Sequence, residues 1–152
     1  MVKSGRSGTA SCIFCEIVKG TRPAHVIERT PTVIAFLDGL RQPVDPAHVL
    51  VIPRAHIENI YGIDDALGAD LFATHARLAR AVKRAFAPDG ITTWSSNEPA
   101  GGQEVPHFHL HVFPRRAGVP LASAVRREDP EVPVPDAILA SSAERLRAVL
   151  GR

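Results

Sequence analysis

Short runs of β-branched and aromatic residues alternate with turn-forming residues through the first third of the chain. The runs cover residues 25–27, 32–37 and 48–52, and prolines and glycines separate them. The first two runs are joined by Glu28–Pro31, a connection short enough for an antiparallel hairpin. This part of the sequence therefore predicts antiparallel strands.

A helical pattern follows over residues 64–87. Apolar side chains recur there mostly at intervals of three and four residues, Asp64 can cap the first turn, and Pro88–Gly90 ends the element. The apolar positions are Leu67, Leu71, Leu78, Val82 and Phe86. The basic residues of this segment occupy other faces, so we expect a long helix with one face on the core and one in solvent.

The second half of the chain predicts two more strands, at 91–95 and 107–113, and an amphipathic helix over 136–150. Five prolines crowd between residues 114 and 135, which favours an extended connection. No repeat and no linker divides the chain. The expected class is α+β, with an antiparallel sheet of about five strands, a long central helix and a C-terminal helix.

Composition fits one ordinary domain. The chain has 152 residues, of which 45% are hydrophobic and 22% charged. Eighteen basic against sixteen acidic residues give a net charge of +2, too balanced for general nucleic-acid binding. No apolar run approaches the roughly 18 to 20 residues of a membrane span. Residues 1–11 lack the apolar segment of a secretory signal. We interpret them as a flexible arm and expect a cytoplasmic protein.

Three histidines are spaced by two within the strand predicted at 107–113. Because successive side chains of a strand alternate between faces, His107, His109 and His111 share one face and the apolar residues between them share the other. An ordinary solvent-exposed face would favour Thr, Lys or Glu. The pattern therefore favours a functional site over a polar surface that happens to use histidine three times.

A flexible loop, Pro99–Gln103, precedes this strand. Its glycines permit close approach to a ligand, and exposed backbone N–H groups in such a turn can bind an anion. Imidazoles beside an anion site suit phosphate chemistry, since a neutral imidazole can attack phosphorus and a protonated neighbour can stabilise the added charge. The sequence contains no P-loop motif.

The segment His107–Phe113 matches the His-φ-His-φ-His-φ-φ motif of the histidine triad superfamily of nucleotide hydrolases and transferases. Four further blocks resemble that superfamily in the expected order: Cys12–Val18, Ala35–Asp38, His48–His56 and Asn97–Gln103. The resemblance covers residues 12–116, which we interpret as a histidine triad domain. Residues 117–152 form a Pro-rich connection and a C-terminal helix, which we expect to pack on the same domain.

The resemblance implies a role for each matching residue. His109 corresponds to the nucleophile, which forms a nucleotidyl-histidine intermediate that water hydrolyses. His111 and His48 correspond to residues that line the phosphate pocket, and Asp38 to the acidic residue that receives the ribose hydroxyls. The expected polar contacts on the phosphate and leaving-group side are Asn97 and Gln103. The expected apolar slot for the base consists of Phe36, Ile13, Phe14 and Ile17. Phe36 and Ile17 could instead be plain core, and Asp38 could merely cap a turn.

Taken alone, Cys12 and Cys15 could be a redox pair, half of a zinc site or two core cysteines. The resemblance implies that they hold zinc together with His56 and His107. Two thiolates and two imidazoles leave no coordination position open, so the expected ion is structural. No organic cofactor is expected.

The resemblance leaves the substrate open. The expected reaction is hydrolysis at the α-phosphate of adenosine 5′-monophosphate derivatives such as phosphoramidates. The alternatives are cleavage of diadenosine polyphosphates and a nucleotide-binding regulatory protein with negligible turnover. Glu104 occupies a position that is often Ser or Thr in relatives, and the loop 39–47 is about two residues longer than in typical members. The expected partners are a small nucleotide and a second copy of the chain, with the sheet extended across a homodimer. His25 and His75 match nothing functional.

Overall fold

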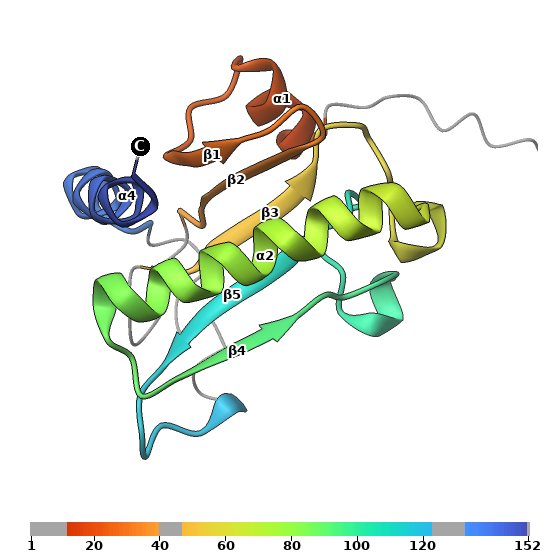
Figure 1. Ribbon diagram of the computed structural model, residues 1–152. Coiled ribbons are helices and arrows are strands. Elements are labelled where there is room, and N and C mark those ends of the chain that lie inside the picture. Colours follow the sequence, from red (N-terminus) through yellow and green to blue (C-terminus); the bar gives the residue numbers. More distant parts are fainter. Residues whose placement is uncertain (1–11, 40–46, 123–132, 152) are drawn as a thin grey trace, which may run out of the picture.

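The computed structural model describes residues 12–39, 47–122 and 133–151. It contains one five-stranded sheet in the order β1-β2-β3-β5-β4, with every neighbouring pair antiparallel (Figure 1). The strands are β1 (Val26–Arg29), β2 (Val33–Leu37), β3 (Val49–Pro53), β4 (Gly90–Trp94) and β5 (Leu110–Arg115). The predicted α+β class and five-stranded antiparallel sheet are confirmed.

In the described residues three α-helices pack on this sheet. The long helix α2 (Asp65–Phe86) crosses one face of the sheet, and α4 (Asp136–Leu150) lies beside it near β1 (Figure 1). Asp64 caps α2, because its side chain accepts a hydrogen bond from the backbone of Leu67. The short helix α1 (Ile13–Lys19) was not predicted as a helix.

Side chains of β2 and β3 alternate strictly between two apolar clusters, one on each face of the sheet. Val33, Ala35 and Leu37 of β2 belong to the cluster that includes α2 and α4, whereas Ile34 and Phe36 belong to a second cluster with α1. In β3 the same alternation continues through Val49–Ile52. Helices therefore cover one whole face, and on the opposite face α1 covers only part.

The histidine segment differs from the prediction in its boundaries. β5 begins at Leu110, so His107 and His109 lie in the segment before the strand rather than within it. The alternation nevertheless holds, since Phe108, Leu110 and Val112 pack into the cluster with α2. The backbone of Phe108 donates a 2.7 Å hydrogen bond to the carbonyl of Ile57, which ties the segment to the loop after β3 before it joins the sheet.

An ion pair between a buried carboxylate and a half-buried arginine ties β1 to the long helix. Arg77 donates from Nη2 and Nε to the two carboxylate oxygens of Glu28, at 2.8 and 3.2 Å. Glu28 is 2% exposed, and this two-point contact offsets the cost of burying its charge. The pair holds the first strand in place beneath α2.

Three sequence-based expectations lie wholly or partly outside the described residues: the arm at 1–11, most of the loop 39–47 and part of the segment 117–152. Among the helices in the described ranges, none is long and apolar enough to span a membrane. The cytoplasmic location stays a prediction.

Candidate active site

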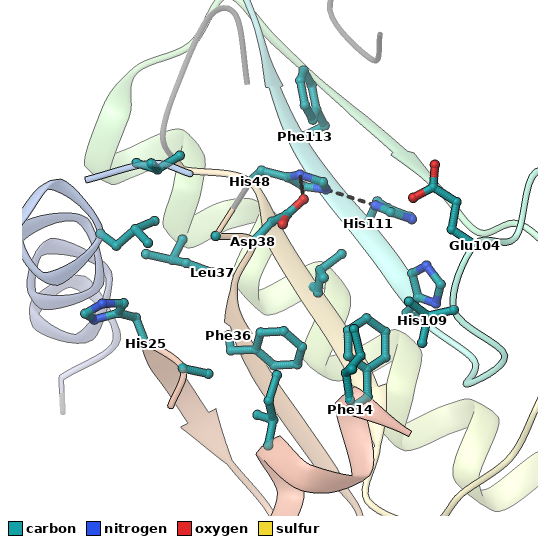
Figure 2. A pocket seen from close by; sticks show the side chains of 18 of the residues that line it. Phe14, His25, Phe36, Leu37, Asp38, His48, Glu104, His109, His111 and Phe113 are labelled. Atoms are coloured by element: carbon teal, nitrogen blue, oxygen red, sulfur yellow. Dashed lines mark hydrogen bonds and ion pairs between the residues drawn. The ribbon is translucent and has the colours of Figure 1, made fainter. Parts of the chain in front are cut away.

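The sheet face opposite α2 is hollowed into a cavity of about 1220 Å³. Side chains from α1, from four strands and from the start of α4 line it, and Figure 2 shows several of them converging on its interior. Eight of the residues that sequence analysis assigned to catalysis or nucleotide binding are part of this lining. They are Ile13, Phe14, Ile17, Phe36, Asp38, His48, His109 and His111.

His109 is held in one orientation by its own segment. Its Nδ1 donates a 2.7 Å hydrogen bond to the carbonyl oxygen of His107, so the proton of the neutral ring sits on Nδ1 and the lone pair on Nε2. The side chain is 6% exposed. Burial lowers the pKa of His109, against the smaller opposing influence of the Asp38 and Glu104 carboxylates. A neutral imidazole with a free Nε2 lone pair is the reactive form of a histidine nucleophile.

Beside it, three side chains form a polar chain: Asp38 directly after β2, His48 directly before β3, and His111 in β5. Asp38 Oδ2 lies 3.0 Å from His48 Nδ1, and His48 Nε2 lies 2.9 Å from His111 Nδ1 (Figure 2). The exposed fractions of Asp38 and His48 are 9% and 4%. The buried carboxylate thus lies at ion-pair distance from the first imidazole, and the hydrogen bond between the two imidazoles orients the second.

The apolar end of the cavity lies beneath α1. Phe14 packs edge-on against Phe36, with ring centroids 5.5 Å apart, and also edge-on against His109 at 5.3 Å. Ile17 joins the same cluster, and Ile13 is 37% exposed at its rim. These side chains form an apolar wall next to the imidazoles.

Gln103 and Asn97 are not among the residues that line the cavity. The Gln103 side chain accepts from the backbone N–H of Glu98 at 2.7 Å and donates to the carbonyl of Glu58 at 2.6 Å. Asn97 accepts a 2.8 Å bond from the backbone of Ile60. Both amides therefore hold the two loops that flank the histidine segment, and their predicted contacts with substrate stay predictions.

A second cluster lies on the other side of His109. The ligand atoms of Cys12, Cys15, His56 and His107 all lie within 4.8 Å of one another. The shorter separations are 3.4 Å from Cys12 Sγ to His107 Nδ1 and 3.3 Å from Cys15 Sγ to His56 Nδ1. In a zinc tetrahedron of sulfur and nitrogen ligands the edges are about 3.5 Å. The four residues thus fit a Cys₂His₂ zinc site.

The chemistry of these donors agrees with metal binding. His107 Nε2 donates a 2.9 Å hydrogen bond to the carbonyl of Pro53, which leaves Nδ1 as the lone-pair nitrogen that faces the thiols. Burial lowers the pKa of His107 to about 4, so the ring is neutral at pH 7. Burial, followed by the Cys12 thiol, raises the pKa of Cys15, so the site holds protons that a metal ion would displace.

The family model described as the HIT domain matches residues 19–118, about two thirds of the chain. The chain belongs to the histidine triad (HIT) family. The protein named hit from Bacillus subtilis is 40% identical over 105 residues, which are 69% of this chain and 71% of that protein.

Two further relatives of this HIT protein bear on its chemistry. Adenosine 5′-monophosphoramidase hnt1 of Schizosaccharomyces pombe is 34% identical over 105 residues, 69% of this chain and 74% of that one. The crystal structure of a Zn-bound histidine triad family protein from Mycobacterium smegmatis superimposes with a TM-score of 0.75 at 33% identity, and covers 95% of this chain and 96% of that one.

The structure also brings in residues that sequence reasoning left without a role. His75 of α2 donates from Nε2 to the carbonyl oxygen of His111 at 2.9 Å, so it supports β5 from the far face of the sheet. Trp94 lines the cavity from the end of β4. At the opposite end, His25 Nε2 lies 2.7 Å from Asp136 Oδ1 of α4. A prediction of the strand order and register would have paired Trp94 with His111 and so placed Trp94 at the cavity.

Proposed function

We propose that this HIT protein is a nucleotide hydrolase that acts at the α-phosphate of adenosine 5′-monophosphate derivatives, with phosphoramidates as the preferred class. The observation that carries the proposal is the orientation of His109, whose Nε2 lone pair is free while Nδ1 donates to the His107 carbonyl. The fission yeast relative is named as an adenosine 5′-monophosphoramidase, which supports the substrate class.

In the proposed reaction the Nε2 lone pair of His109 attacks the α-phosphorus, and the bond from phosphorus to the leaving amine breaks. The amine departs with the bonding electron pair and takes up a proton, and the nucleotidyl group stays on His109. Water then attacks the same phosphorus, the phosphorus–nitrogen bond to His109 breaks, and AMP leaves with a proton released. The ring of His109 returns to its neutral state.

The remaining side chains of the cavity fit the rest of such a substrate. The edge-on pair Phe14 and Phe36 provides an apolar surface for the base. A carboxylate can accept several hydrogen bonds, so the contact of Asp38 with His48 leaves capacity for ribose hydroxyls. His111 sits between the nucleophile and His48, with ring centroids 4.8 Å from His109, where it can offset charge on a phosphate.

Replacing His109 with alanine tests the nucleophile. We expect H109A to lower kcat on adenosine 5′-monophosphoramidate by about a thousandfold or more, because the variant lacks the Nε2 lone pair that attacks the phosphorus in the proposed reaction. Thermal unfolding and AMP binding, measured on the same preparation, should stay close to the wild type. Retained turnover in a folded H109A protein would contradict the assignment. A wild-type protein that binds AMP but never turns over would favour the regulatory alternative.

The leaving group is the point on which the phosphoramidate and polyphosphate alternatives differ. Glu104 lines the cavity, and Figure 2 shows its carboxylate close to His111 on the side away from the base slot. A negative charge there repels a polyphosphate leaving group and tolerates or attracts an amine. The carboxylate therefore favours phosphoramidates over diadenosine polyphosphates.

Substituting Glu104 tests this preference. We expect E104S to raise kcat/KM for diadenosine tetraphosphate relative to adenosine 5′-monophosphoramidate by roughly tenfold, since one repulsive charge is removed. E144S makes the same change on the exposed face of α4 and serves as the matched control. An unchanged ratio in E104S, or an equal change in E144S, would mean that the carboxylate does not select the leaving group.

We infer that the Cys₂His₂ cluster holds a structural zinc ion. The ion would join α1, which carries Cys15 and the base-slot residue Phe14, to His107, two residues before the nucleophile. With four protein ligands it would leave no position for substrate, so its contribution would be to fix the segment that carries His109.

Metal analysis tests the ion directly. Native mass spectrometry of protein purified without chelators should show about one zinc per chain, and C15S should lose it. H25A, which alters a histidine outside the cluster, should retain it. Removal of the metal should lower the unfolding temperature. Wild-type protein with both thiols reduced and no bound zinc would contradict the inference.

We also propose a homodimer in which two β4 strands pair across a two-fold axis. Among the described strands β4 lies at an edge of the sheet, a position from which a strand can pair with a strand of a second chain. On the neighbouring helix α2, Phe72 is 70% exposed, which is unusual for so large an apolar side chain. Phe72 lies one turn from His75, whose contact with His111 places it level with the end of β4.

Sedimentation velocity tests the dimer. The wild type should sediment as a dimer at micromolar concentration, and F72E should shift it toward monomer because a charge would be buried at the interface. I138E, which places the same charge at an apolar side chain 44% exposed on α4, is the control and should remain dimeric. A monomeric wild type would refute this proposal and leave the nucleophile assignment untouched.

A further inference from the structure

An indole ring lies flat against one of the cavity imidazoles. Trp94 and His111 have ring centroids 4.2 Å apart and planes that differ by only 5°. The two residues are directly paired between the antiparallel strands β4 and β5, so the backbone itself holds the rings in register. Trp94 is the only tryptophan in the chain.

The polar chain restricts where protons can sit near this stack. Asp38 Oδ2, 3.0 Å away, favours a proton on Nδ1 of His48. If His48 is neutral, its Nε2 is an acceptor, and His111 Nδ1, 2.9 Å away, must donate to it. The outer nitrogen of a neutral His111 then carries a lone pair, which would repel a phosphate oxygen.

One additional proton on the pair His48 and His111 replaces the lone pair on the outer nitrogen of His111 with an N–H group. If the proton resides on His111, both of its nitrogens become donors. If it resides on His48, that ring donates to His111 Nδ1, and the outer nitrogen of His111 then carries the hydrogen. In either arrangement the pair presents an N–H group to the cavity and carries one positive charge.

We propose that Trp94 is a positioning residue that holds His111 flat and stabilises the cationic state of the pair His48 and His111, so that His111 donates a hydrogen bond to the phosphate. The face of an indole carries negative electrostatic potential, and a cation stacked on that face is stabilised. The 5° angle presents this face to His111, whereas an edge-on ring would present its positive rim. The phosphate contact rests on the proposed function; the effect of the indole on the histidine pair does not.

Other charged and titratable groups also face His111. Within the cavity these are Asp38, His48, His109 and Glu104, and from α2 His75 contacts its carbonyl oxygen. The two carboxylates favour the cation and the neighbouring imidazoles oppose it. All of them remain in a Trp94 variant, so a change on substituting Trp94 reports the indole.

Fluorescence of the single tryptophan tests the proposal without substrate. A protonated imidazole quenches indole emission on contact, so the emission of Trp94 should fall as pH is lowered through the titration of the histidine pair. The step should disappear in H111N and persist in H25N, which alters a histidine at the α4 end of the cavity. A step that survives unchanged in H111N, or no step in the wild type, would overturn the proposal.

The pH profile of kcat/KM tests the consequence for catalysis. Because the pair must be protonated, activity should fall on the alkaline side. W94L should move this limb to lower pH by about half a unit to one unit, since a weaker cationic state loses its proton earlier. W94F, which keeps a weaker aromatic face, should move it less and also covers the case in which W94L does not fold. An equal loss of kcat/KM at every pH in both variants would mean that Trp94 has a purely structural role and would overturn the proposal.

If the wild type shows no turnover, the proposed function fails, and the fluorescence titration still decides the role of Trp94.

Discussion

The strict alternation of residues 107–113 between two faces of the sheet is the constraint on which the rest of the structure depends. Phe108 and Val112 are buried in the cluster beneath α2, and this burial determines the register of the whole segment. The intervening histidines must then emerge on the opposite face. A shift by a single residue would bury the imidazoles in the apolar core and expose the phenylalanine.

The position of this segment also determines the hydrogen-bond partner of each histidine ring. His107 donates to Pro53 and presents Nδ1 to the two thiols, while His109 donates to the carbonyl of His107 and keeps Nε2 free. His111 is oriented by His48 on one edge and by the face of Trp94. Three identical side chains thus become a candidate metal ligand, a candidate nucleophile and a candidate phosphate donor because the partner of each ring differs.

Helix α1 connects the two sites. It carries Cys15 toward the metal cluster and Phe14 toward the cavity, and the Phe14 ring touches both His107 and His109 edge-on. The ordering of the base slot and the ordering of the candidate nucleophile are therefore mechanically coupled. A zinc ion at the cluster would strengthen this connection from the side that substrate does not use.

The sequence allowed much of this arrangement to be predicted, because the strands and α2 carry strong periodic signals. Helix α1 was missed because its seven residues are too few for a helical period to show. The loop amides Gln103 and Asn97 match polar positions of the family. Their hydrogen-bond partners are backbone groups, which the sequence does not indicate. The stacking of Trp94 on His111 depends on strand pairing between segments that a hydrophobic pattern cannot align. The roles assigned to the triad by resemblance stay predictions.

The central claim is that Nε2 of His109 forms a covalent bond to the nucleotide. It is tested most directly by mixing the wild-type protein with adenosine 5′-monophosphoramidate, quenching within the first turnover at alkaline pH, where phosphohistidine bonds survive, and mapping peptides by mass spectrometry. We expect an adenylyl group on the peptide that contains residues 107–113, located on His109 by fragmentation. Turnover with the adenylyl group on another residue, or with no enzyme-bound nucleotide at any quench time, would contradict it.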